Sequence, residues 1–139
     1  MSTTPGKTLI LIADDRASSR ELLRLVLERA GYTVIESEDG YQALGRARSE
    51  CPDLVLLDLQ MPGLDGYGVL AALRSEARFE NLPVLALTAS AMTGDRERIL
   101  AAGFTDYLAK PAGPELLRET VARLLSEASA RSLDGEETA

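Results

Sequence analysis

Three short runs of this chain, at residues 9–13, 54–57 and 84–87, are apolar throughout. A strand with one face in water alternates apolar and polar side chains, so these runs predict strands buried on both faces. Two weaker strand patterns complete the predicted set, which is residues 8–13, 32–36, 53–57, 83–87 and 105–108. Segments of helical periodicity separate the strands. The pattern predicts an α/β fold, a doubly wound parallel sheet with helices on both faces.

The helical segments carry apolar stripes at the spacing of one buried helix face. They are a first helix that ends before Gly31, residues 40–49, residues after Asp65, residues 91–102 before Gly103, and residues from Pro114 onward. The stripes are Leu22, Leu23, Val26, Leu27 and Ala30 in the first helix, Val69, Leu70 and Leu73 in the third, and Leu116, Leu117, Val121, Leu124 and Leu125 in the fifth.

Polar residues near the predicted helix starts suggest how these helices are capped. Asp39 is a predicted N-cap of the second helix, and Asp65 precedes the third. Ser18 and Glu21 have the spacing of a capping box near the start of the first helix. Pro114 suits the first turn of the last helix.

The length of 139 residues suits one domain. We assign residues 1–6 to an N-terminal extension, 7–126 to the domain and 127–139 to an acidic, flexible tail that frays after Ser126. Apolar runs are only about five residues long, far short of a membrane span, and the N-terminus lacks a signal-peptide core. The sequence therefore predicts a soluble, cytoplasmic protein with no membrane partner.

The scarcity of histidine and cysteine limits the catalytic and metal sites that this chain can form. The sequence has no histidine and a single cysteine, Cys51. These absences exclude Ser-His-Asp and Cys-His catalytic machinery and zinc sites built on such ligands. Any metal must be held by oxygen, which favours Mg²⁺, with Mn²⁺ possible. A formal net charge of −7 without a basic patch argues against direct nucleic-acid binding. Cys51 is predicted to be a buried small residue or a helix-end residue.

Charged and hydroxyl residues stand where the predicted strands end. They are Asp14 and Asp15 after the first strand, Asp58 after the third, Thr88 after the fourth and Lys110 after the fifth. In doubly wound sheets functional residues gather at this edge. Three converging carboxylates need a cation, and Asp58 could then attack phosphorus while Mg²⁺ and Lys110 offset the charge on the phosphoryl oxygens. Taken singly, these residues also suit helix caps, turns or the surface, but their coincidence favours a site.

Four stretches carry a family resemblance: LILIADD at residues 9–15, DLVLLDLQMPGLDG at 53–66, ALTA at 86–89 and AAGFTDYLAKP at 101–111. With them, the chain resembles a stand-alone receiver domain of bacterial two-component response regulators over about residues 7–125. The resemblance implies a flavodoxin-like (βα)5 fold with strand order 2-1-3-4-5. The chain departs from the family pattern at Ala112-Gly113-Pro114, because family members usually have a branched apolar residue after the Lys-Pro pair.

The resemblance also implies residue roles. Asp58 would be the phosphoacceptor. Asp15, Asp58 and the backbone carbonyl of Gln60 would bind Mg²⁺ directly, and Asp14 would bind it through water. Lys110 would pair with the phosphoryl group.

Further family positions concern the switch and the lifetime of the phosphoryl group. Thr88 and Tyr107 would be the switch side chains, and the Lys110–Pro111 peptide would be cis. Gln60 and Ser90 would flank the path of the hydrolytic water. Neither is a carboxylate, so slow self-dephosphorylation is expected.

The partners implied by the resemblance are proteins. The phosphoryl donor would be a phosphohistidine on a sensor histidine kinase or a histidine phosphotransfer protein. A downstream protein would bind the face of the fourth helix, fifth strand and fifth helix, at about residues 91–125. The chain would not be an enzyme beyond self-phosphorylation and self-dephosphorylation.

Two other functions remain open. One is an Mg²⁺-dependent aspartyl-phosphate phosphatase of the haloacid-dehalogenase type. That class places a carboxylate two residues after its nucleophile, where this chain has Gln60. The other is a pseudo-receiver that binds partners without phosphorylation, against which the retention of the site residues argues.

Overall fold

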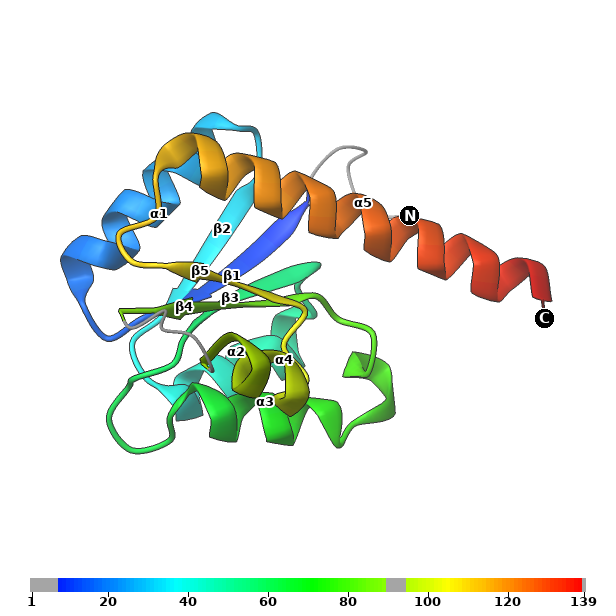
Figure 1. Ribbon diagram of the computed structural model, residues 1–139, viewed down its shortest axis with the longest axis horizontal. Coiled ribbons are helices and arrows are strands. Elements are labelled where there is room, and N and C mark those ends of the chain that lie inside the picture. The colour runs from blue at the N-terminus through cyan, green and yellow to red at the C-terminus, as the bar shows by residue number, and fades with distance from the viewer. Residues whose placement is uncertain (1–7, 90–94, 139) are drawn as a thin grey trace.

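The computed structural model describes residues 8–89 and 95–138, with side chains through residue 130. Its elements follow in the order β1 (Leu9–Ala13), α1 (Ala17–Arg29), β2 (Thr33–Ser37), α2 (Gly40–Glu50), β3 (Leu54–Asp58), α3 (Gly66–Arg74), the short 3₁₀ helix η1 (Ala77–Phe79), β4 (Val84–Thr88), α4 (Asp95–Ala102), β5 (Asp106–Ala109) and α5 (Pro114–Thr138). The strands form one parallel sheet in the order β2-β1-β3-β4-β5. Helices α1 and α5 cover one face, and α2, α3 and α4 cover the other (Figure 1). This arrangement confirms the predicted fold class and strand order.

The sheet separates two apolar clusters, which explains the unbroken apolar runs. In β1, Leu11 packs into the cluster beneath α2, α3 and α4, while Ile10 and Ile12 pack into the cluster beneath α1 and α5. Alternate residues of β3 and β4 divide in the same way. Because both faces of the central strands are buried, neither face accommodates polar side chains, and the only polar residues of β3 and β4 are at their ends.

Four of the strands begin and end one residue later than the sequence pattern suggested. Asp58 and Thr88 are therefore the last residues of β3 and β4, rather than the first residues beyond them. Parallel pairing continues through both positions, with Asp58 opposite Leu87 and Thr88 opposite Ala109. Apolarity marks where a strand is buried on both faces, but backbone pairing sets where it ends.

The cap predicted at Asp39 is confirmed, the capping box predicted at Ser18 is wrong, and Asp65 is found to cap the helix that it precedes. Asp39 Oδ1 accepts the amide of Gln42 at 2.8 Å, and Asp65 caps α3 in the same way. The capping box predicted at Ser18 is wrong, because α1 begins at Ala17 and Ser18 is an exposed residue within it. The carboxylate of Asp14 instead accepts the first free amide of this helix, that of Arg16.

Several surface predictions need correction. Leu22 and Leu116, which were assigned to buried stripes, are 54% and 52% exposed. Both belong to stripes broader than the face that the sheet can cover. Cys51 is exposed rather than buried, but it does lie at a helix end, where it follows α2 with a left-handed φ of 49°. The third-helix residues Val69 and Leu73 are buried as predicted.

Helix α5 is longer than the sequence analysis proposed. It continues to Thr138, so the helix does not end at the predicted domain boundary near Ser126. Residues 126–138 contain no proline, and their alanine, glutamate, arginine and leucine favour continuation of the helix, although Gly135 is a weak helix former. The C-terminal part of α5 extends past the sheet (Figure 1). No helix among the described residues combines the length and apolarity needed to span a membrane.

Candidate functional site

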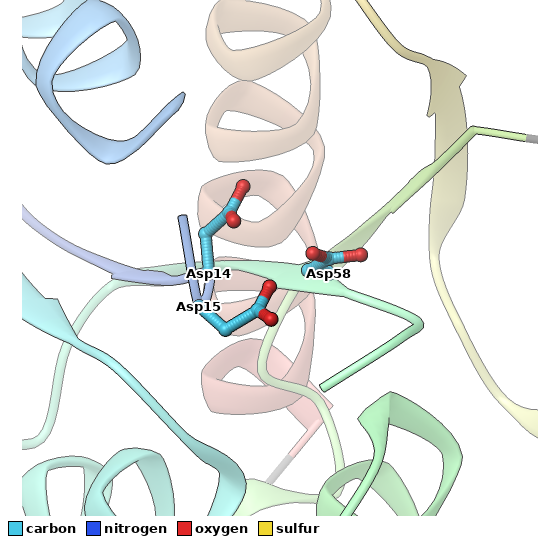
Figure 2. Close-up of side chains that lie close together, drawn as sticks. All are labelled: Asp14, Asp15 and Asp58. Atoms are coloured by element: carbon cyan, nitrogen blue, oxygen red, sulfur yellow. The ribbon is translucent and has the colours of Figure 1, made fainter. Parts of the chain in front are cut away.

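The carboxylates predicted from strand ends do come together. Asp14 and Asp15 follow β1, and Asp58 ends the neighbouring strand β3, whose Leu57 pairs with Ala13. One carboxylate oxygen from each aspartate lies within 4.8 Å of the others. Figure 2 shows the three side chains grouped at this edge of the sheet. Asp14 and Asp58 are buried, whereas Asp15 is exposed.

Lys110 supplies a cation between the two buried carboxylates. Its Nζ lies 2.9 Å from Asp14 Oδ2 and 3.0 Å from Asp58 Oδ2. The lysine follows β5, where its amide donates to the carbonyl of Thr88 at 2.8 Å. The Lys110–Pro111 peptide is cis, as expected. An ammonium shared by two buried carboxylates offsets part of their desolvation cost.

The two buried aspartates differ in their affinity for a proton. Burial raises the pKa of Asp58, and the Gln60 amide and Lys110, which both favour the charged form, do not reverse the shift. Burial also acts on Asp14, but hydrogen bonds from Ser19, the Arg16 amide and Lys110 outweigh it and lower its pKa. For Lys110, burial is outweighed by the two carboxylates, so its pKa is raised. Of the two buried carboxylates, Asp58 therefore has the greater affinity for a proton.

The donor set suits a hard cation. Among the described residues, Asp14, Asp15 and Asp58 form a cluster of acidic groups that are close enough together to hold a metal ion. Oxygen-only ligands favour Mg²⁺ over softer metals. Asp15 and Asp58 line an open pocket together with Gln60 and Lys110. The residues present therefore fit Mg²⁺.

The remaining predicted residues are only partly located. Thr88 ends β4 with its side chain buried, at the same edge of the sheet as Asp58. Tyr107 is half-buried on the edge strand β5, opposite Ala86. Gln60 is exposed, and its backbone N–H donates to Asp58 Oδ1 at 3.1 Å. Ser90 lies outside the described residues. The switch, metal-ligand and lifetime roles of these residues stay predictions.

Two residues of α1 that contact Asp14 were missed by the sequence analysis. Ser19 Oγ donates to Asp14 Oδ2 at 2.6 Å, and Arg20 Nη1 donates to the Asp14 carbonyl at 2.8 Å. A signal for Ser19 was present, because it precedes the buried Leu23 by four residues and so lies on the buried face of α1. A polar residue on such a face requires a hydrogen-bonding partner.

Comparison with known proteins identifies response regulators as relatives of this chain. The family model described as "Response regulator receiver domain" matches residues 10–122. The "Polar-differentiation response regulator DivK" of Brucella ovis is 36% identical over 119 residues, which are 86% of this chain and 97% of that protein. The "Probable transcriptional regulator ycf27" of Porphyridium aerugineum is 43% identical over 119 residues. This chain spans about half the length of the ycf27 proteins, 48% in that case.

Solved structures agree in fold. The chemotaxis response regulator CheY4 of Vibrio cholerae has a TM-score of 0.81 and 31% identity, covering 85% of this chain and 98% of its own. The receiver domain of sensor histidine kinase PA1611 from Pseudomonas aeruginosa has a TM-score of 0.80 and 35% identity, with coverage of 86% and 98%. That structure is described as having a magnesium ion coordinated in the active site cleft.

Proposed function

This chain belongs to the response regulator receiver domain family, and from that membership we propose that it is a signalling receiver activated by phosphorylation of Asp58. The observation that carries the proposal is the position of Lys110 Nζ, which contacts both buried carboxylates at 2.9 and 3.0 Å. A partly buried cation shared in this way leaves Asp58 next to an open pocket and next to a charge that can pair with incoming phosphoryl oxygens.

The proposed reaction is a phosphoryl transfer from a phosphohistidine of a sensor histidine kinase or a histidine phosphotransfer protein. A carboxylate oxygen of Asp58 attacks phosphorus, forming a phosphorus–oxygen bond as the phosphorus–nitrogen bond of the donor breaks. The electron pair of the broken bond stays on the imidazole nitrogen, which takes up a proton. Lys110 faces the charge that develops on the phosphoryl oxygens. The backbone N–H of Gln60 donates to the other carboxylate oxygen of Asp58.

Mg²⁺ would be held by Asp15, Asp58 and the backbone carbonyl of Gln60, with Asp14 bound through water. When bound, the ion neutralises charge on phosphoryl oxygens and orients them for in-line attack. Mn²⁺, with the same preference for oxygen, is a possible substitute. The support from this structure is the donor set itself, three carboxylates with oxygens within 4.8 Å of one another.

The proposed output is a change of the surface formed by α4, β5 and α5. Thr88 would move toward the phosphoryl group, and Tyr107 would change its packing against the core cluster beside β5. The support is positional, because Thr88 ends the strand next to Asp58 and Tyr107 lies half-buried on the edge strand. A downstream protein would bind this face, and the phosphoryl group would bias it between two packings.

The other two functions lack such support. The haloacid-dehalogenase type needs an acid or base two residues after its nucleophile. Gln60 is at that position, and its side-chain carboxamide can serve as neither. The pseudo-receiver is disfavoured because Asp14, Asp58 and Lys110 are in direct contact. A chain that had lost phosphorylation would not need to maintain this costly buried arrangement.

The test is incubation with acetyl phosphate and Mg²⁺, followed by mass spectrometry of the intact protein and its peptides. One phosphoryl group on Asp58 is expected in the wild type and none in Asp58→Asn. Asp39→Asn is the matched control, because asparagine keeps the cap of α2 and this position is outside the acidic cluster. Labelling that persists in Asp58→Asn, or that is equal in EDTA, would contradict the proposal.

A further inference from the structure

The Asp14 backbone is fixed from two sides. Its amide donates to the Ser37 carbonyl at 3.1 Å, which ties it to β2. Its carbonyl accepts Arg20 Nη1 at 2.8 Å, and Arg20 Nε lies 3.2 Å from Glu36 Oε1. The remaining freedom of this residue is rotation of its side chain. The groups that hydrogen-bond to the carboxylate therefore determine how the Asp14 side chain is oriented in the site.

Three donors hold that carboxylate. The Arg16 amide donates to Oδ1 at 2.9 Å. Oδ2 accepts Ser19 Oγ at 2.6 Å and also contacts Lys110 Nζ at 2.9 Å. Lys110 and Ser19 thus share one oxygen, and they approach it from different elements, the end of β5 and the first turns of α1.

We propose that Ser19 is a positioning residue that acts through Asp14 on Lys110 and on the bound cation, an inference that rests on the proposed function. When Lys110 turns from Asp14 toward a phosphoryl oxygen, Asp14 Oδ2 loses one donor and keeps the Ser19 hydroxyl. A buried carboxylate oxygen without a donor is costly, so Ser19 lowers the cost of the lysine's movement. Ser19 also keeps Oδ2 from turning toward Lys110 alone, which preserves the orientation of Asp14 toward the cation.

The neighbouring Ser18 provides a matched control. It is on the same helix turn and has the same side chain, but it is exposed. Substituting either serine by alanine changes helix propensity equally, so a difference between the two variants reports the contact with Asp14. Ser19→Thr retains a hydroxyl and should restore the wild-type behaviour that Ser19→Ala loses.

The experiment is a calorimetric titration of each folded variant with Mg²⁺, followed by its rate of labelling from acetyl phosphate. Groups that orient metal-binding residues typically change metal affinity by 10–100-fold, so we expect Mg²⁺ to bind Ser19→Ala about tenfold more weakly than Ser18→Ala. Ser19→Thr should bind within about twofold of the wild type on the same scale. In an Asp14→Asn background, Ser19→Ala should have little further effect, because the residue through which it acts has lost its charge.

The outcomes separate the two claims. If the wild type takes up no phosphoryl group on Asp58, the proposed function fails whatever the titrations show. If the wild type is labelled but Ser19→Ala and Ser18→Ala bind Mg²⁺ equally, the proposed function stands and the role of Ser19 is refuted. An equal loss from Ser19→Ala in the wild-type and Asp14→Asn backgrounds would also refute it, since the serine would then act by another route.

Discussion

Replacing Asp15 by asparagine should stabilise the metal-free protein. The site has three carboxylates with oxygens within 4.8 Å of one another, and Lys110 is the cation that contacts the two buried ones. Asp15 is the exposed member, so its removal breaks neither of the Lys110 ion pairs. The substitution keeps the size of the side chain and removes one of the mutually repelling charges.

The expected gain follows from Coulomb's law. At 4.8 Å, two unit charges repel by about 0.9 kcal/mol in water and by about 3.5 kcal/mol at an effective dielectric constant of 20. Asp15 is exposed, so solvent screening favours the lower figure. We therefore expect the free energy of unfolding of Asp15→Asn to exceed that of the wild type by about 1 kcal/mol in EDTA at low salt. Added potassium chloride should reduce the difference, because it screens exposed charges.

Mg²⁺ should reverse this order. A ligand present at ten times its dissociation constant stabilises a folded protein by about 1.4 kcal/mol, and the variant has lost a ligand carboxylate. Urea unfolding followed by circular dichroism, in EDTA and in Mg²⁺, measures both effects, with Glu80→Gln as an exposed acidic control outside the cluster. The reasoning is refuted if Asp15→Asn is less stable than the wild type in EDTA. Equal stabilisation of both proteins by Mg²⁺ would remove Asp15 from the ion's coordination.

Three further predictions concern the stability of the fold and of the site. Gly66→Ala should destabilise the protein by about 1–3 kcal/mol, because the new Cβ would lie 2.6 Å from the Asp58 carbonyl oxygen, whereas Gly45→Ala, in open space, should stabilise it by about 0.5–1 kcal/mol; urea unfolding compares the two. In metal-free buffer, Asp58→Asn should be more stable than the wild type, and urea midpoints should show the margin shrinking as the pH falls through the raised pKa of Asp58, where the wild-type carboxyl also becomes neutral. Arg74→Met should cost about 3 kcal/mol in thermal unfolding, because Arg74 donates to three backbone carbonyl oxygens, including that of Gly103.

The sequence was informative about the site because parallel strands share an edge. Asp14, Asp58 and Lys110 are far apart in the chain, yet each follows or ends a run with a strand pattern. Once those runs are strands of one parallel sheet, their carboxyl ends lie at one edge, and the order of the strands then brings Lys110 to Asp14 and Asp58. The order of the strands came from the family resemblance, because apolarity alone does not distinguish one parallel neighbour from another.

Other properties could not be read from the sequence because they depend on side-chain direction. Asp14 and Asp15 are adjacent and chemically identical, but one is buried against Lys110 and the other is exposed. Leu22 and Leu116 fit apolar stripes and are exposed all the same, because a helix buries only the width of face that its neighbours cover. The contact from Ser19 to Asp14 depends on where α1 begins, and the misplaced cap at Ser18 concealed it.

The site is built against its own stability, and this connects its geometry to its function. A fold optimised for stability would not bury Asp14 and Asp58 around a single ammonium and place Asp15 beside them. Hydrogen bonds from Ser19 and the Arg16 amide stabilise the charge on Asp14, but for Asp58 burial outweighs the corresponding contacts and raises the pKa. Asp58 and the exposed Asp15 both line the open pocket, so two neighbouring carboxylates face it with Lys110 as the cation that contacts Asp58. A cation or an electrophilic phosphorus that binds there relieves repulsion already present in the folded chain, so binding and chemistry draw on energy stored by the fold.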